Sequence, residues 1–235
     1  MTEVVRIIIV VAHQTIVLCF FSILIYRLLR NERSRKTFSL ALFYFLCIAF
    51  TALNSVYVFV KTNPLTFWLH FLSVYLMLLS PVFYYVFNMM ILKSEEVLNV
   101  RLERIIIVIY SSSLFIMMFI FGFVLQGVTI NESTSWRPDW NIFLFFIPMV
   151  VFITCIYLIP SVVRYIQILT RIKNEELRKR WNILSLGFFI LIGVGYGVFF
   201  YNSWDNAIFK TIWLLISLIL TPSASLMIYY GFRSM

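Results

Sequence analysis

Seven long runs of apolar residues, separated by short polar stretches, set the pattern of this 235-residue chain. A membrane-spanning helix needs about 20 consecutive, mostly apolar residues. Seven segments meet this requirement without containing a single acidic residue: 4–29, 37–60, 65–92, 105–125, 142–168, 182–201 and 210–230. The pattern therefore predicts seven transmembrane helices joined by short connections, the longest of which is 126–141.

The composition of the chain agrees with this pattern. Hydrophobic residues make up 62% of the chain and charged residues 12%, against about 45–50% and about 25% in soluble globular domains. Such a chain cannot cover a water-soluble surface with polar side chains, so a soluble enzyme, a nucleic-acid-binding domain and a disordered protein are excluded. We expect an all-α seven-helix bundle that forms one domain over residues 1–235, surrounded by the lipid bilayer of the cell membrane as a multi-pass protein.

The basic residues lie unevenly on the two sides of the predicted bundle. Fifteen of the 19 fall on the side of the C-terminus: Arg27, Arg30, Arg33, Arg35, Lys36, Lys93, Arg101, Arg104, Arg164, Arg171, Lys173, Arg178, Lys179, Arg180 and Arg233. The opposite side has only Arg6, Lys61, Arg137 and Lys210. Because cytoplasmic loops carry the excess of Lys and Arg, this predicts an outer N-terminus and an inner C-terminus. The net charge of +9 is then a topology signal, and we expect no nucleic-acid partner.

Polar residues inside the spans are the best local indication of function. Seven of them fall at similar depths, toward the outer ends of their helices: His13, Gln14, Asn54, His70, Tyr75, Tyr196 and Ser217. Their common depth favours an outward-open polar cavity that binds a small or lipophilic ligand. The simpler alternative is that each makes one interhelical hydrogen bond, worth about 1 kcal/mol, and has no further role.

Catalytic and metal-binding arrangements are absent from the sequence pattern. The spans hold no acid that could orient a catalytic base, and the chain has no Gly-rich phosphate loop and no H-E-x-x-H motif. Two histidines could in principle ligate one haem, but a metal site normally needs a third and a fourth ligand. We therefore expect no enzyme activity, no metal and no cofactor.

A basic cluster precedes the sixth predicted span. It consists of Arg171, Lys173, Arg178, Lys179 and Arg180. Glu175 precedes Lys179 by four residues and Glu176 precedes Arg180 by four, a spacing that supports helical ion pairs and so a helix that extends beyond the bilayer. The cluster is either a solvated loop that faces phospholipid or a docking surface for a cytoplasmic signalling protein.

Two features of the outer side agree with the predicted orientation. Trp136, Trp140 and Trp204 gather there, as expected of interfacial aromatic residues. Asn131 begins an Asn131-Glu132-Ser133 sequon in the longest outer connection, which makes Asn131 a glycosylation candidate.

Small residues and prolines predict how the helices pack. Gly193 and Gly197 form a G-x-x-x-G face, which allows close helix contact either within the bundle or in a homodimer. Four prolines predict kinks in the third, fifth and seventh spans: Pro81, Pro148, Pro160 and Pro222. Three cysteines also lie inside apolar segments, where we expect small buried side chains without disulfides: Cys19, Cys47 and Cys155.

Three stretches carry a resemblance to a known family: the basic run 27–36, the Arg178-Lys179-Arg180-Trp181 cluster and the Leu184-Ser185-Leu186-Gly187 sequence after it. In these the chain resembles the seven-helix sensory region at the N-terminus of many prokaryotic histidine kinases, and related archaeal membrane proteins. The resemblance implies a sensor. Because the sequence ends at Met235 without a coiled coil or kinase, the signal would pass to a separate protein.

These observations leave three hypotheses for function. The first is a receptor-like sensor that signals through its basic inner connections. The second is a transporter or channel for a small neutral solute, since the spans lack the buried acid that ion coupling usually needs. The third is an assembly or scaffold subunit.

Overall fold

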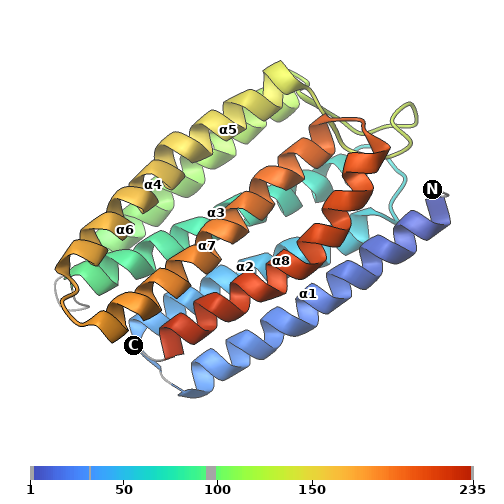
Figure 1. Cartoon of the computed structure of the whole chain (residues 1–235). Helices are drawn as coiled ribbons and strands as arrows, with labels where there is room; N and C mark the ends of the chain where they lie inside the picture. Colours follow the sequence, from blue (N-terminus) through green and yellow to red (C-terminus); the bar gives the residue numbers. More distant parts are fainter. Residues whose placement is uncertain (1–2, 32, 94–98, 234–235) are drawn as a thin grey trace.

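Seven long helices run side by side and alternate in direction in the computed structural model, which describes residues 3–31, 33–93 and 99–233 (Figure 1). Five are unbroken: α1 (Glu3–Asn31), α2 (Arg35–Tyr57), α3 (Leu65–Lys93), α7 (Glu175–Ser203) and α8 (Ala207–Arg233). The other two contain π-helical turns. In the fourth, α4 (Val100–Met118) continues into η1 (Phe119–Val124). The fifth comprises, in order, η2 (Ile142–Phe146), α5 (Ile147–Ile153), η3 (Thr154–Leu158) and α6 (Ile159–Arg171). The all-α class and the seven predicted helices are confirmed.

Several helices begin earlier than hydropathy predicts, because polar caps extend them. The Asn99 side chain accepts a hydrogen bond from the Arg101 amide at 2.9 Å, and α4 begins at Val100. The Asn174 side chain accepts from the amides of Glu176 and Leu177, so α7 begins at Glu175 and not at residue 182. An N-cap satisfies backbone donors that are otherwise unpaired, which a hydropathy window does not register.

The bundle has two ends, and Figure 1 labels the chain termini at opposite ones. The N-terminal end holds the start of α1 together with the α2–α3, η1–η2 and α7–α8 connections. The C-terminal end holds the α1–α2 and α6–α7 connections and the end of α8.

A small hairpin lies at the N-terminal end. Strand β1 (Val128–Thr129) pairs antiparallel with β2 (Asp139–Trp140), with Val128 opposite Trp140. In the turn between them, Ser135 and Trp136 have φ angles of 53° and 57°. Residues other than Gly adopt this left-handed conformation at a cost of roughly 1–3 kcal/mol each, so the surrounding structure must hold them there.

The fifth helical stretch is interrupted in the way its prolines predict. Pro148 and Pro160 each lie in the first turn of an α-helical segment, α5 and α6, and each segment follows a π-helical turn. Pro81 lies inside α3, where it removes the backbone hydrogen bond to the Met77 carbonyl. The Ser80 hydroxyl donates to that carbonyl at 2.9 Å instead, so the buried acceptor stays paired.

The outer surface of the bundle is apolar. Phe143, Ile208 and Ile219 have exposed fractions of 78%, 72% and 69%, and many further large apolar side chains are similarly exposed. The seven helices are also long and apolar enough to cross a membrane. A soluble monomer rarely exposes apolar surface on this scale, so the fold supports a multi-pass membrane protein.

The prediction that the cysteines are buried is wrong for two of the three. Cys19 and Cys155 are exposed on the bundle surface, and Cys47 is partly buried. In a helix that contacts lipid, both the inner and the outer face are apolar. An apolar neighbourhood in sequence therefore does not predict burial.

Aromatic side chains fill the middle of the bundle. The rings of Tyr84 and Phe188 stack at a centroid distance of 3.4 Å, and Phe43 packs against both. Tyr44, which is fully buried, packs on Phe43 and donates from its hydroxyl to the Ser225 carbonyl at 3.2 Å. We call Phe43, Tyr44, Tyr84 and Phe188 the aromatic floor, because the cavity described below ends on it.

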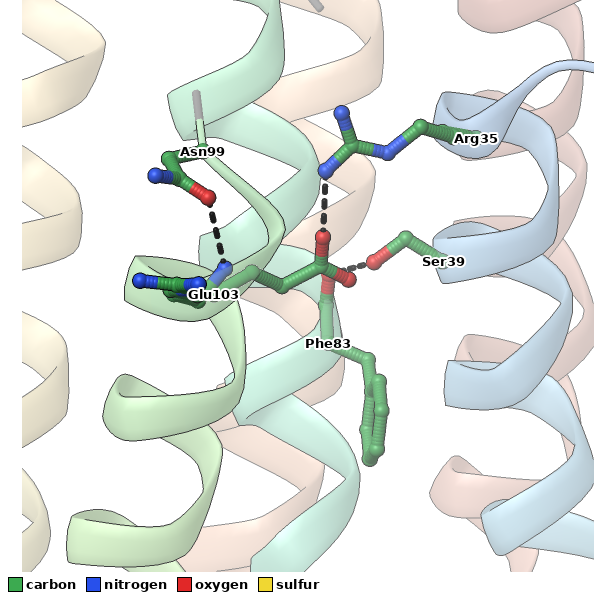
Figure 2. Close-up of polar contacts among 6 residues, drawn as sticks. Arg35, Ser39, Phe83, Asn99 and Glu103 are labelled. Atoms are coloured by element: carbon green, nitrogen blue, oxygen red, sulfur yellow. Dashed lines mark hydrogen bonds and ion pairs between the residues drawn. The ribbon is translucent and has the colours of Figure 1, made fainter.

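Polar contacts tie α2 to its neighbours near the C-terminal end, as Figure 2 shows. The Ser39 hydroxyl donates to the Phe83 carbonyl on α3 at 2.8 Å. The Arg35 guanidinium pairs with the Glu103 carboxylate on α4 at 2.7 Å. These contacts hold three helices together below the aromatic floor.

Candidate ligand-binding site

A cavity of about 400 Å³ extends into the bundle from the N-terminal end, between α1, α2, α3, α7 and α8. Binding sites for small molecules typically measure about 300–1,000 Å³. On α1 the lining residues are Val10, His13, Gln14, Val17 and Phe21. Their spacing of three and four residues places them on one helix face, so one side of α1 lines the cavity along its length.

One residue on the face of α7 that lines the cavity contributes to the open volume because it has no side chain. Phe188, Leu191, Gly195, Phe199 and Asn202 recur at helical spacing and line the wall. A Cβ atom placed on Gly195, at the centre of this face, would meet no heavy atom of the described chain within 4 Å. The missing side chain of Gly195 therefore contributes directly to the open volume.

Six of the seven polar residues that the sequence singled out line this one cavity. They are His13, Gln14, Asn54, His70, Tyr196 and Ser217. The seventh, Tyr75, lies on another face of α3, where its hydroxyl donates to the Ser111 carbonyl of α4 at 3.3 Å. The structure thus brings together side chains from five helices and leaves Tyr75 outside the group.

His70 is the most enclosed polar residue of the site, with an exposed fraction of 4%. The indole Nε1–H of Trp140 donates to its Nε2 at 3.1 Å. In the neutral ring the proton must then be on Nδ1. That atom is buried and has no hydrogen-bond partner in the described chain. It is therefore a donor in the cavity wall that a ligand could satisfy, since a buried donor left unpaired is costly.

The polar groups on α1 leave further hydrogen-bonding capacity. Gln14 is buried, and its Oε1 accepts from the Ser55 hydroxyl at 2.5 Å. The ring of His13 is within reach of the backbone of Ser217, while its Nε2 is buried without a partner among the residues described. The residues that line the cavity therefore include two buried imidazole nitrogens without a partner among the residues described.

Three charged residues lie at the mouth of the cavity: Arg137, Asp205 and Lys210. The Lys210 ammonium donates to Asp205 at 2.9 Å. This hydrogen bond and the charge of Lys210 lower the pKa of Asp205 below its usual value, and the charge of Arg137 adds to the effect. The Nε of Arg137 is buried and has no partner in the part of the chain that the structure describes.

Sequence reasoning missed the residues that cover the cavity. Trp140 was predicted only as an interfacial aromatic residue at the outer end, but its side chain also lies inside the bundle: its exposed fraction is 1%, it packs on Phe145 and Phe199, and its indole donates to His70. Trp136 is partly buried and lines the cavity mouth with Arg137. The Trp136-Arg137-Pro138-Asp139-Trp140 run was the available signal, since two aromatics that flank a cation in an outer loop are suited to capping a site.

The two predicted packing glycines have different surroundings. A Cβ on Gly197 would lie 1.8 Å from the Trp213 ring of α8, so Gly197 permits close contact inside the bundle. A Cβ on Gly193 would meet nothing within 4 Å in the described chain, and Gly193 is exposed. The G-x-x-x-G pattern therefore does not act as a single packing face within one chain.

The predicted docking cluster lies around the α6–α7 connection. Arg171 ends α6, and Lys173, Arg178 and Lys179 are exposed. Arg180 forms the expected ion pair with Glu176 one turn earlier on α7. All five predicted basic residues are thus near each other at the C-terminal end of the bundle, with four of them accessible.

Asn131 lies in the turn of the hairpin. Its side-chain oxygen accepts from the Ser133 hydroxyl at 2.6 Å and from the Thr134 amide at 3.2 Å. The sequon is thus in a connection at the N-terminal end, and glycosylation of Asn131 stays a prediction.

A metal ion would find few ligands at this site. The described residues contain no group of three or more His, Cys, Asp and Glu side chains close enough to hold one. Both histidines line the cavity, but the Nε2 of His70 is already hydrogen-bonded to Trp140. The arrangement is instead suited to an organic molecule, because apolar walls enclose a few hydrogen-bonding groups.

Comparison with protein-family models, with curated proteins and with solved structures found no match to this chain.

Proposed function

We propose that the protein is a membrane sensor or receptor-like protein that binds a small, lipophilic ligand in the cavity at its N-terminal end. The single observation that carries this proposal is the shared cavity of His13, Asn54 and His70, which come from three helices and lie far apart in sequence. Helix packing alone does not require a space of about 400 Å³, nor a buried imidazole donor without a partner.

The closed end of the cavity favours a binding protein over a channel. Phe43 and Phe188 line its deep end, and the stacked ring of Tyr84 lies directly against Phe188. Tyr44 completes this floor with an exposed fraction of 0%. A solute that entered from the N-terminal end would stop at these rings, so a continuous pore would require a large rearrangement of the floor.

The division of the basic residues supports an orientation with the N-terminal end outside the cell. Fifteen of the 19 Lys and Arg residues belong to the other side, and short loops with such an excess remain in the cytoplasm. In this orientation the cavity takes its ligand from outside or from the outer half of the bilayer, and the plasma membrane is the expected location.

Helix α7 offers a direct path from the cavity to the cytoplasmic side. It runs without interruption from Glu175 to Ser203, so Gly195 in the cavity wall and Lys179 in the docking cluster belong to one rigid element. A ligand that displaced the outer half of α7 would displace the basic cluster as well. We propose that this cluster contacts a separate signalling protein, as the resemblance to kinase sensory regions implies.

Photo-crosslinking in native membranes tests this function. A crosslinker at position 173 or 179 is expected to capture a kinase, a response regulator or another signalling protein, and the yield should differ between the native chain and a Gly195→Phe variant whose cavity is filled. A Gly193→Phe variant, changed at an exposed position of the same helix, should match the native chain. Equal yields from all three chains, together with solute flux in proteoliposomes above that of empty vesicles, would favour the transporter instead.

A further inference from the structure

The cavity has one unpaired cation at its mouth and apolar walls below it. Lys210 is neutralised by Asp205, which it meets at 2.9 Å. Arg137 forms no ion pair with any described residue, and its Nε is buried without a hydrogen-bond partner. Asp205 and Arg137 are close enough for their charges to interact, yet no hydrogen bond joins them in the described chain. The charges of the three lining residues therefore sum to +1, contributed by Arg137.

The backbone holds Arg137 in this position. It follows two residues in the left-handed conformation, Ser135 and Trp136. Its own amide donates to the Thr134 carbonyl at 3.1 Å. On the other side Trp140 anchors the second strand through its hydrogen bond to His70. A guanidinium at the mouth of a cavity is well placed to bind a carboxylate, because its donors match the two oxygens of that group.

The cavity below Arg137 is long. Its lining on α7 extends from Asn202 to Phe188, fourteen residues at 1.5 Å each, or about 21 Å along the helix axis. On α8 it extends from Ala207 to Thr221, which is again about 21 Å. This length accommodates an extended hydrocarbon chain.

The polar side chains divide along this length. Arg137 and Lys210 are at the mouth, and Asn54 and His70 lie on the same outer portions of α2 and α3. The deep part is lined mostly by apolar side chains, Phe21 and Phe43 among them, down to the aromatic floor, with Ser80, Tyr157 and Thr221 as its polar members. An occupant that matches both parts has its polar group at one end and a hydrocarbon body at the other.

From this arrangement we infer that the cavity binds an anionic amphiphile, a long-chain monocarboxylate, with its carboxylate on Arg137 and its hydrocarbon chain extending toward Phe188. This inference rests on the proposed function, because it names the chemical class of the ligand for the same cavity. The side chain of Asn54, which is partly exposed in the cavity lining, would bind an oxygen atom of the headgroup. Apolar burial would supply most of the affinity, and Arg137 would supply the preference for an anion.

Two probes of equal chain length test the inference: radiolabelled palmitate and its neutral counterpart, hexadecanol. Binding is measured to the full chain in phosphatidylcholine nanodiscs, with empty nanodiscs as background. The native protein should bind palmitate at least about tenfold more tightly than hexadecanol, since a hydrogen bond to a charged group contributes this much or more. Arg137→Gln should remove that difference by weakening palmitate alone, and Lys61→Gln, at an exposed cation outside the cavity lining, should leave both affinities unchanged.

The other outcomes separate this inference from the proposed function. Equal affinities for the two probes in the native protein, with both lost in Gly195→Phe, would overturn the assignment of an anionic headgroup while the cavity remains a lipophilic site. An unchanged palmitate affinity in Arg137→Gln would overturn it as well. If neither probe bound the native protein above empty nanodiscs, the inference would be wrong, and the proposed lipophilic ligand would lose its support with it.

Discussion

The indole of Trp140 donates a hydrogen bond of 3.1 Å to Nε2 of His70, and this bond joins the hairpin over the cavity to α3 in the cavity wall. Both side chains are almost completely buried, with exposed fractions of 1% and 4%. Trp140 therefore decides which nitrogen of the neutral His70 ring bears the proton.

Replacement of Trp140 by Phe is expected to destabilise the protein by about 1–3 kcal/mol, because it leaves the buried Nε2 of His70 without its donor. Thermal unfolding of the detergent-solubilised protein measures the change. A Trp140→Phe/His70→Phe double variant should lose less stability than the sum of the two single variants. Strict additivity would show that the two side chains do not interact.

The two glycines of the G-x-x-x-G pattern should respond differently to substitution. Gly197→Leu forces a Cβ against the Trp213 ring, and overpacking of this kind costs about 1–3 kcal/mol. Gly193→Leu adds a side chain to open space and should change the unfolding free energy by less than about 0.5 kcal/mol. The same unfolding assay compares them, and equal losses would contradict the close packing of α7 on α8.

The Asp205–Lys210 ion pair should give the stability a dependence on acid pH. The pKa of Asp205 is lowered in the folded protein, so the pair stabilises the fold above the ordinary Asp value of 3.8 and the contribution is lost as the pH falls through the lowered pKa. Because the side chain of Asp205 is 99% exposed, the effect should be small. Melting temperatures from pH 3 to 6 should show it in the native chain and not in Asp205→Asn.

Lys210→Gln provides the matched control for this pair. It removes the partner without changing the carboxylate, and it should abolish the same increment of stability. A native-like pH profile in either variant would show that another group is responsible.

The proposed orientation can be tested with single cysteines in a chain whose three native cysteines are replaced by Ala. Ser133→Cys, in the hairpin turn, should react with a membrane-impermeant maleimide added to intact cells. Lys173→Cys, in the α6–α7 connection, should react only after the cells are permeabilised. Both positions are exposed, so the reverse pattern would reverse the orientation.

Hydropathy was sufficient to predict the seven helices, because a run of about 20 apolar residues has few other stable structures. Depth along the helices also identified six of the cavity residues, among them His13 and Asn54. Depth along the helix did not predict that Tyr75 lies outside the cavity. It follows His70 by five residues, which at about 100° per residue places it about 140° around α3, so helical phase would have separated the two.

The hydropathy pattern could not predict the parts of the site that lie in the connections between helices. Preference for the membrane interface describes the depth of a Trp side chain, and Trp140 satisfies it while it points inward to His70. The position of Arg137 at the cavity mouth depends on a turn in which Ser135 and Trp136 have left-handed backbone conformations. The spacing of hydrophobic residues along the chain does not predict such a turn. Gly195 was overlooked because its contribution is the absence of a side chain.

The central claim is that the cavity holds a small lipophilic molecule, and the most direct test is to identify what the protein carries when it is purified. The native chain, Gly195→Phe and Gly193→Phe would be purified from the same membranes, extracted with organic solvent and compared by mass spectrometry. The native chain and Gly193→Phe should retain one amphiphilic compound in near-equimolar amount, and Gly195→Phe, with its cavity filled, should lose it. Equal extracts from all three chains would contradict the claim, because whatever they carried would then be bound outside the cavity.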